Sequence, residues 1–390
     1  MSQHQLVGKV RPRGRRGCGR FYTMNTMKGS IKKLAVVWLA LVTSACATLG
    51  YYSQSISGHL NVMQRRQPIE DLLDSGTIST ELKARLSAAQ SMRRFASTVL
   101  GLPDNGSFTR YADLERPYAV WNVFAAPELS LELNEWCYPF AGCVTYRGYF
   151  SEAKARAQAG QLRVQGYDTY YGGVAAYSTL GWFDDPLLNT VTGYRDARLA
   201  GLIFHELAHQ QLYIPGDTLF NEGFATAVEH AGVRRWLEQQ ADPAMTSDYA
   251  THRRHQQAFH ALVARTRAQL EQVYAGELPD SDKRRLKKQY LEAMRAEYAR
   301  QRQSGDVDSN YDAWFAGKLN NARLGAVNTY RAYVPLFEGL FANCGGDFSV
   351  FYQRAAAIGA VPGPQRLERL RQAAAATGVA GDQAGIPSQD

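Results

Sequence analysis

The sequence predicts an α+β fold in which a strand-rich stretch lies between helical regions. Apolar residues recur at helical spacing over residues 58–100, Tyr, Val, Trp and Phe with frequent Gly dominate residues 111–183, and helical periodicity returns from residue 194. Of the 390 residues, 45% are hydrophobic and 21% are charged, which is enough apolar material for a core. This composition excludes a disordered chain.

The N-terminal segment has the composition of a targeting sequence. Residues 1–46 contain nine of the 44 Lys and Arg residues and no acid, and Lys28, Lys32 and Lys33 precede the apolar run of residues 34–42. A basic stretch, a short apolar run and small residues after it are typical of a secretory signal peptide. The run is too short to span a bilayer. The alternative, a short buried helix, fits poorly with a segment that has no acid.

The cysteine at the end of this segment suggests a membrane anchor. Residues Thr43-Ser44-Ala45-Cys46 resemble the lipobox of bacterial lipoproteins, in which the cysteine is lipidated and becomes the mature N-terminus. Ala47 resembles the outer-membrane sorting type. The resemblance implies a bacterial envelope protein, held by a lipid on Cys46 at the outer membrane and facing the periplasm. The remaining 35 cations and 36 acids nearly cancel, which argues against a nucleic-acid partner.

The secondary structure can be predicted in chain order from periodicity and turn residues. Residues 58–100 are expected to form a helical hairpin broken at Asp74-Ser75-Gly76, and the charged residues 251–303 a solvated helix pair that turns at residues 276–279. The other expected elements are strands at Tyr118–Phe124, Val144–Tyr149 and Val164–Trp182, and helices at residues 194–213 and 217–240.

Two cysteines in the strand-rich stretch are candidates for a disulfide. Cys137 and Cys143 bracket a turn that contains Pro139 and Gly142, in a chain expected to reach an oxidising compartment. The alternative is two buried thiols. Cys344 has no obvious partner and is expected to be a buried thiol.

The motif His205-Glu206-Leu207-Ala208-His209 is the strongest chemical signal in the sequence. Residues four apart lie on one face of a helix, so His205 and His209 can bind one metal ion. Glu206 is rotated away from them and would lie beside the ion, where it can accept a proton from the attacking water. The flanking residues are apolar, and burying these polar groups is costly unless they bind a metal or each other. A hydrogen-bonded structural pair of histidines is the alternative.

A catalytic zinc site needs a third protein ligand, and Glu222 has the right spacing. Pro215 and Gly216 end the first helix, and Asp217 is a suitable N-cap for the second, so the two helices should run antiparallel. His209 and Glu222 then lie at the same level. Glu229, seven residues after Glu222, either supports a ligand histidine through a hydrogen bond or is an ordinary surface residue.

The two motifs together resemble those of a known enzyme class. His-Glu-Leu-Ala-His at residues 205–209 and Asn-Glu-Gly-Phe-Ala at 221–225 are similar to gluzincin zinc peptidases, especially the alanyl-aminopeptidase type. That resemblance implies a zincin-like core, with a small sheet packed on the helix of residues 205–209 and helical hairpins around it. It also makes Glu222 the third ligand of one zinc ion.

The similarity extends further when other segments are included. The lipobox and residues 136–150, 172–183 and 320–324 make the mature chain similar to a family of predicted bacterial lipoprotein aminopeptidases. This implies a signal region at residues 1–46, a tether at 47–58, a metallopeptidase domain at 59–372 and a disordered tail at 373–390.

The resemblance implies hydrolysis of peptide bonds, with Glu206 as general base. Enzymes of this kind stabilise the oxyanion with a Tyr or His, and Tyr330 is the candidate here, with simple packing as the alternative. The segment Val174–Phe183 would pair with an extended substrate or serve as a core strand. Asn320 and Asn321 would bond substrate backbone or cap a turn.

The mode of cleavage and the oligomeric state stay open. Aminopeptidases of this type bind the substrate's α-amino group with a Glu upstream of the zinc helix, and the corresponding stretch here offers only Asp184 and Asp185 just beyond it. Endopeptidase action is therefore an alternative. A further alternative from another class is an envelope scaffold lipoprotein that retains a structural zinc site.

Overall fold

The computed structural model describes residues 50–138, 142–177, 179, 183–328 and 333–375. Residues 1–53 and 54–390 form two separate units. Of the first unit, residues 50–53 are described and are helical. The signal region, Cys46, Tyr330 and residues 376–390 lie outside the described residues. Among the described helices, none combines the length and the apolar composition of a membrane-spanning segment.

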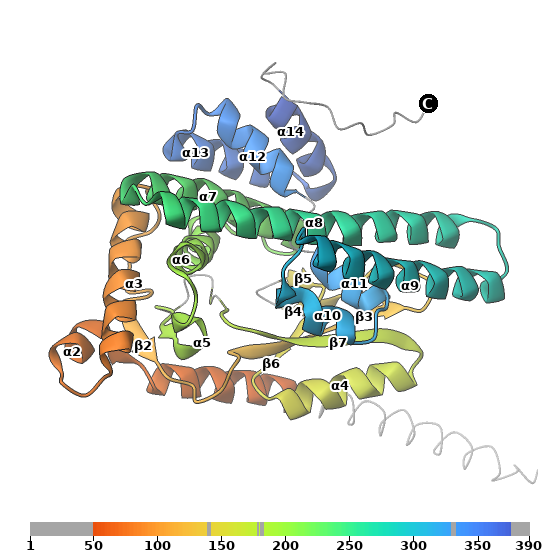
Figure 1. Ribbon diagram of the computed structural model, residues 1–390, viewed down its shortest axis with the longest axis horizontal. Coiled ribbons are helices and arrows are strands. Elements are labelled where there is room, and N and C mark those ends of the chain that lie inside the picture. Colours follow the sequence, from red (N-terminus) through yellow and green to blue (C-terminus); the bar gives the residue numbers. More distant parts are fainter. Residues whose placement is uncertain (1–49, 139–141, 178, 180–182, 329–332, 376–390) are drawn as a thin grey trace, which may run out of the picture. The chain divides into compact units, whose positions relative to one another are not determined.

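The second unit is an α+β structure in which helices predominate (Figure 1). It begins with helical residues 54–64. The helices that follow are α2 (Ile69–Asp74), α3 (Thr80–Thr98), α4 (Glu152–Val164), α5 (Asn189–Thr192), α6 (Asp196–Gln211), α7 (Thr218–Gln240), α8 (Pro243–Ala275), α9 (Asp280–Ser304), the 3₁₀ turn η1 (Ser309–Tyr311), α10 (Asp312–Ala316), α11 (Asn321–Asn328), α12 (Val334–Asn343), α13 (Phe348–Gly359) and α14 (Gly363–Ala375).

Within the described residues, the strands form three small sheets. The main sheet has the order β6-β3-β7 and is antiparallel, a second has the order β1-β2-β8, and β4 pairs with β5. The strands are β1 (Gln67–Pro68), β2 (Arg110–Ala112), β3 (Val120–Pro127), β4 (Trp136–Tyr138), β5 (Gly142–Val144), β6 (Arg147–Tyr149), β7 (Tyr167–Val174) and β8 (Leu187–Leu188). Cys137 and Cys143 are joined by a disulfide across the β4–β5 hairpin, and Cys344 is a buried free thiol.

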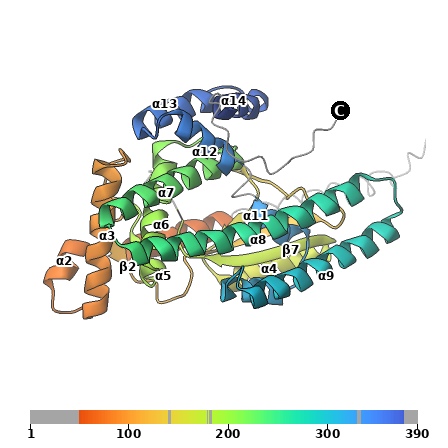
Figure 2. The same cartoon turned by 45° about the horizontal axis from the view of Figure 1, so that its top comes forward.

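The largest core surrounds α6 and α7. Its fully buried side chains include Phe204 of α6, Phe224 of α7, Phe337 of α12 and Phe351 of α13. α3 packs against α6, and α12 packs against α7. Both views show α12, α13 and α14 grouped beside α7 (Figures 1 and 2). Hydrophobic packing against α3 and α12 therefore holds α6 and α7, the two helices that carry the chemical motifs.

The helix pair of residues 251–303 is confirmed, with its turn between Ala275 and Asp280. α8 starts earlier than expected, at Pro243, because Asp242 accepts hydrogen bonds from Ala244 N and Met245 N as an N-cap. The pair is not solvated all round. One face is buried in a second core with α10 and α11, formed by residues such as Phe259, Leu262, Leu291 and Met294.

The packing of the main sheet differs from expectation. α4 and α11 pack against β3 and β7, whereas α6 packs on α3 and α7. The sheet therefore does not lie directly on the helix of residues 205–209. Helix α4 was itself missed because its surroundings have strand-like composition. The available signals were Ser151, whose hydroxyl accepts from Lys154 N as a cap, and the buried Ala155, Ala159 and Leu162.

The predicted strand at residues 174–183 ends at its first residue, Val174. The described residues that follow are held by side-chain hydrogen bonds instead of a strand ladder. Thr190 Oγ1 donates to Ala175 O, and Thr179 N donates to Asp185 Oδ2 over 2.8 Å. β7 is nevertheless an edge strand of the main sheet, because it pairs with β3 on one side and with no described strand on the other.

Two predicted boundaries also shift. Residues 54–58 of the expected tether are helical, and Gln54 is buried because its side chain binds β6, donating to Gly148 O and accepting from Phe150 N. At the other end, α14 reaches Ala375 and so includes the first three residues of the predicted tail. At both ends, residues whose composition predicts flexibility are held in helices by contacts with the rest of the fold.

Candidate metal centre

Helix α6 places the two motif histidines side by side. His205 and His209 lie one turn apart, and their Nε2 atoms are 3.2 Å from each other. Ile203, Phe204, Leu207 and Ala208 around them are fully buried and fix the rotation of the helix. The imidazoles therefore converge on one point at the side of α6 that faces α7.

Helix α7 brings Glu222 to the same point. Its two carboxylate oxygens lie 3.4 Å from His205 Nε2 and 3.7 Å from His209 Nε2. Tetrahedral coordination with ligand bonds of about 2.0–2.1 Å separates neighbouring ligand atoms by about 3.4 Å. Among the described residues, His205, His209 and Glu222 are the group whose ligand atoms all lie within 4.8 Å of one another. The spacing thus fits a single tetrahedral ion with one open position.

The turn between α6 and α7 sets this geometry, and Asn221 fixes the turn. Asn221 Oδ1 accepts from Ile214 N and its Nδ2 donates to Ile214 O, both at 2.8 Å. Asp217 caps α7 by accepting from Phe220 N. No role was expected for Asn221 from the sequence, although its position next to Glu222 was a usable signal.

Two glycines permit the close approach of the surrounding elements. A Cβ atom on Gly201 would lie 3.2 Å from Glu229 Cγ, so its absence makes room for that side chain beside α6. A Cβ atom on Gly223 would lie 2.9 Å from Tyr333 Cβ, where the start of α12 packs on α7. The Gly of the second motif is therefore explained by close packing next to Glu222.

Glu229 contacts one of the two candidate ligand histidines. Its Oε2 lies 3.2 Å from His205 Nδ1, the ring nitrogen that faces away from Glu222. A carboxylate on this nitrogen fixes the tautomer that presents Nε2 to a metal and increases the basicity of the ring. By contrast, His209 Nδ1 is buried without a hydrogen-bond partner among the described residues.

The Glu229 contact leads to a first prediction. Glu229→Gln is expected to weaken zinc binding by about 10- to 100-fold, because the amide cannot hold and polarise His205 as a carboxylate does. Competition with a chromogenic chelator measures this change. Glu238→Gln, an exposed Glu on the same helix, is the matched control. Equal zinc affinity of the Glu229→Gln variant and the control would show that Glu229 does not support the ligand.

The two histidines have opposite electrostatic environments in the chain without an ion. Burial lowers the pKa of His209 to about 4, so this imidazole is neutral. Burial also disfavours charge on His205, but its hydrogen bonds and attraction to Glu222 and Glu229 outweigh this and raise its pKa. Despite its burial, Glu222 has a lowered pKa because of His209 and His205. A ligating nitrogen must be unprotonated, so an ion competes with a proton at His205.

Glu206 lies beside the cluster and is not one of its converging ligands. Burial raises the pKa of Glu206 to about 7, and the negative charges of Glu222, Asp185 and Glu229 act in the same direction. His205 partly opposes this shift. A carboxyl group that titrates near neutral pH can both accept and return a proton, which is what a general base and acid requires.

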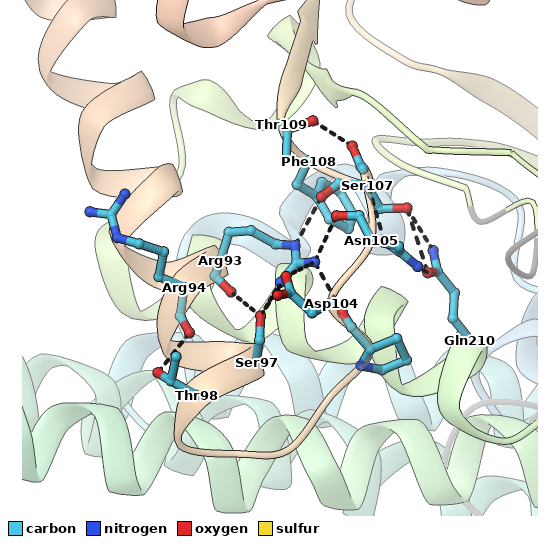
Figure 3. A network of polar contacts seen from close by, with 12 residues as sticks. Arg93, Arg94, Ser97, Thr98, Asp104, Asn105, Ser107, Phe108, Thr109 and Gln210 are labelled. Atoms are coloured by element: carbon cyan, nitrogen blue, oxygen red, sulfur yellow. Dashed lines mark hydrogen bonds and ion pairs between the residues drawn. The ribbon is translucent and has the colours of Figure 1, made fainter.

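A polar network holds the C-terminal end of α6 in place (Figure 3). Gln210, next to His209, accepts from Asn105 Nδ2 over 2.7 Å and donates to Ser107 Oγ over 3.1 Å. Arg93 of α3 is 3% exposed and donates to the carbonyls of Pro103, Ser107 and Asn105. The loop of residues 103–107 is thereby fixed against both helices.

The same network reaches one of the two acids noted in the sequence. Asp185 is 3% exposed, its N–H donates to Ser107 Oγ, and its carbonyl accepts from Phe108 N. Its charge contributes to the raised pKa of Glu206. Asp184 lies next to Gly106, where a Cβ atom would come within 2.4 Å of its carboxylate. Asp185 is therefore close enough to act on the centre electrostatically.

Two tyrosines near the centre are described, whereas the predicted Tyr330 is not. Tyr333 starts α12 and packs on Gly223. Tyr213, in the loop after α6, was not singled out in the sequence. Burial and the negative charge of the candidate ligand Glu222 raise its pKa.

Of the two roles predicted for Asn320 and Asn321, substrate binding was wrong, whereas the cap is confirmed for Asn320, whose Oδ1 accepts from Arg323 N at the start of α11. Both side chains are buried and bind backbone of the chain itself. Asn320 donates to Thr169 O, and Asn321 donates to the carbonyls of Pro127, Glu128 and Ser130. They join the start of α11 to the main sheet, so their amides are not available to a substrate.

The fold and the site together define a helix-rich α+β protein with a buried His-His-Glu cluster that fits a metal ion. Comparison with known proteins then gives its family. Residues 50–370 match the family model described as Putative aminopeptidase, and the chain belongs to this family. No curated protein matches the chain. No solved structure matches it either.

Proposed function

We propose that this protein is a zinc-dependent peptidase of the aminopeptidase type, built on a zincin-like core. The observation that carries the proposal is the convergence of His205, His209 and Glu222 within 4.8 Å, with Glu206 adjacent on the same helix. Two imidazoles and one carboxylate are a donor set typical of catalytic zinc, which keeps an open position for water or substrate. The family description supports the aminopeptidase class.

Each residue has a defined task in this proposal. A zinc ion, when bound, supplies Lewis-acid chemistry that polarises the scissile carbonyl and acidifies water. Glu206 accepts the proton of the attacking water and later gives it to the leaving amine. Glu229 holds His205 in the ligating tautomer through the 3.2 Å contact with Nδ1. Because these side chains are buried, the electrostatic interactions between them are stronger than they would be in water.

We also propose that the protein works in the bacterial cell envelope. The basic and apolar residues 28–42, followed by Cys46, support a lipid anchor at the outer membrane, with the peptidase facing the periplasm. Its partner would then be a peptide substrate in that compartment. Release of the chain from membranes after Cys46→Ala tests the anchor.

Metal removal gives a direct test of the proposed activity. The purified protein, assayed on peptides with free and with blocked N-termini, is expected to lose its hydrolysis in the presence of a chelator, and zinc is expected to restore it. Magnesium, which prefers six oxygen ligands, is the negative control. Hydrolysis restricted to free N-termini identifies an aminopeptidase, and hydrolysis of both kinds an endopeptidase. Zinc binding without hydrolysis of any peptide would instead support the scaffold alternative.

A further inference from the structure

A pocket separate from the three metal ligands lies where α8 faces the turn before α7. Its volume is about 250 Å³. It is lined by residues from the β4–β5 region, the α6–α7 turn and α8, among them Glu135, Cys143, Thr145, Gly216, Thr218 and Arg267. The disulfide hairpin closes one side, since a Cβ atom on Gly142 would approach Gly216 N to 2.5 Å.

Two residues that line this pocket each carry a buried hydrogen-bonding atom that is unsatisfied within the described part of the chain. Arg267 Nη1 and Thr145 Oγ1 are buried and have no hydrogen-bond partner among the described residues. Arg267 also forms no ion pair within the described part of the chain, and burial lowers its pKa in spite of Glu271 one turn away. Buried polar groups in folded proteins are almost always paired. A guanidinium and a hydroxyl left unpaired at one pocket indicate a ligand that accepts two hydrogen bonds.

The two acids at the pocket do not satisfy Arg267. Asp217 accepts from Phe220 N and forms an ion pair with Arg366, so its carboxylate is already used. Glu135 is exposed, and no ion pair joins it to Arg267. Neither of these acids of the described pocket lining is therefore paired with Arg267, and an anionic group of a bound ligand would complete its hydrogen bonding.

We infer that Arg267 and Thr145 bind the C-terminal carboxylate of a peptide substrate. The inference rests on the proposed peptidase function and adds a substrate class to it, namely short peptides with a free C-terminus. A planar carboxylate accepts paired N–H donors from guanidinium with good geometry. The hydroxyl of Thr145 provides a further donor.

The position of the pocket fits a short peptide. Thr218, which lines it, precedes Glu222 by four residues of α7, or about 6 Å of helix rise. An extended peptide covers about 3.3–3.6 Å per residue. A peptide that extends two or three residues beyond the scissile bond is therefore long enough to reach from Glu222 to the pocket edge at Thr218.

The test compares peptides that differ only at the C-terminus. For a series with one to five residues after the scissile bond, the free acid is expected to have a KM about 10- to 100-fold lower than the C-terminal amide, with the difference greatest at two or three residues. Arg267→Met should raise the KM of the acid to near that of the amide, so that the ratio of the two KM values approaches one. Arg265→Met, an exposed neighbour on α8, is the matched control.

Binding measurements separate this inference from the proposed function. Titration of the Glu206→Gln variant with the same acids and amides requires no turnover, and added acetate shows whether a small free carboxylate occupies the pocket equally well. Tighter binding of the acid, lost on Arg267→Met, supports the inference even if no peptide is hydrolysed. Equal binding or equal KM of acid and amide in the wild-type chain overturns it, as would binding of acetate as tight as that of the peptide acid. The wild-type comparison is decisive even if Arg267→Met does not fold.

Discussion

Glu206→Gln is expected to lower the turnover of peptide hydrolysis by on the order of 10²–10⁴-fold while the zinc content stays at the wild-type level. Glutamine has nearly the same size as glutamate but cannot accept the proton of the attacking water. The metal ligands are untouched, because the converging atoms belong to His205, His209 and Glu222. The expected loss therefore falls on kcat, and not on metal binding.

Steady-state kinetics and metal analysis of the same preparation check this prediction. Glu238→Gln makes the same chemical change at an exposed position of α7 and is expected to keep full activity. An unfolding temperature like that of the wild-type chain shows that the Glu206→Gln variant is folded. Turnover that survives in a zinc-loaded Glu206→Gln variant would rule out Glu206 as the general base.

Glu222→Ala is expected to remove zinc binding and, with it, hydrolysis. The substitution deletes one of three ligands, so the affinity should fall by more than the roughly 100-fold that accompanies loss of a residue supporting a ligand. The loss of zinc binding should also be visible in the unfolding temperature. A ligand that binds only the folded state at a free concentration 1,000 times its Kd stabilises that state by about 4 kcal/mol. Zinc should therefore raise the unfolding temperature of the wild-type chain but not that of Glu222→Ala.

Thermal unfolding with and without zinc measures this difference, and Glu238→Ala, which should retain the zinc-dependent increase, is the control. Without zinc, the Glu222→Ala variant is expected to be less stable than the wild-type chain, because His209 and His205 lower the pKa of Glu222 and so favour its charge in the folded state. The comparison is therefore between the zinc-dependent increases of the variants and not between their absolute unfolding temperatures. A zinc-dependent increase as large as that of the wild-type chain would show that Glu222 is not a ligand.

Local sequence predicted the elements that carry the candidate centre. Residues 194–213 and 217–240 were expected to be helical, and α6 and α7 span Asp196–Gln211 and Thr218–Gln240. This succeeded because apolar periodicity, the turn at Pro215-Gly216 and the Asp217 cap all act within a few residues. The turn between α8 and α9 was predictable for the same reason.

Prediction failed where the determining contacts are distant in sequence. The amides of Asn320 and Asn321 are used by carbonyls more than 150 positions away, so they bind the sheet and not a substrate. Residues 54–58 are ordered because Gln54 binds β6. Neither contact produces a periodic or local pattern in the sequence. Taken alone, Asn and Gln at these positions indicate loops.

The sequence by itself determined the chemistry available to this protein: two histidines one helical turn apart, a carboxylate beside them and a second Glu after a short turn. Only the tertiary structure decided how these groups are surrounded. It placed Glu229 on His205, Asp185 near Glu206, and Thr145 with Arg267 at one pocket. The physical reason is that helix periodicity and capping depend on neighbours in the chain, whereas burial and electrostatic environment depend on every element packed around the site.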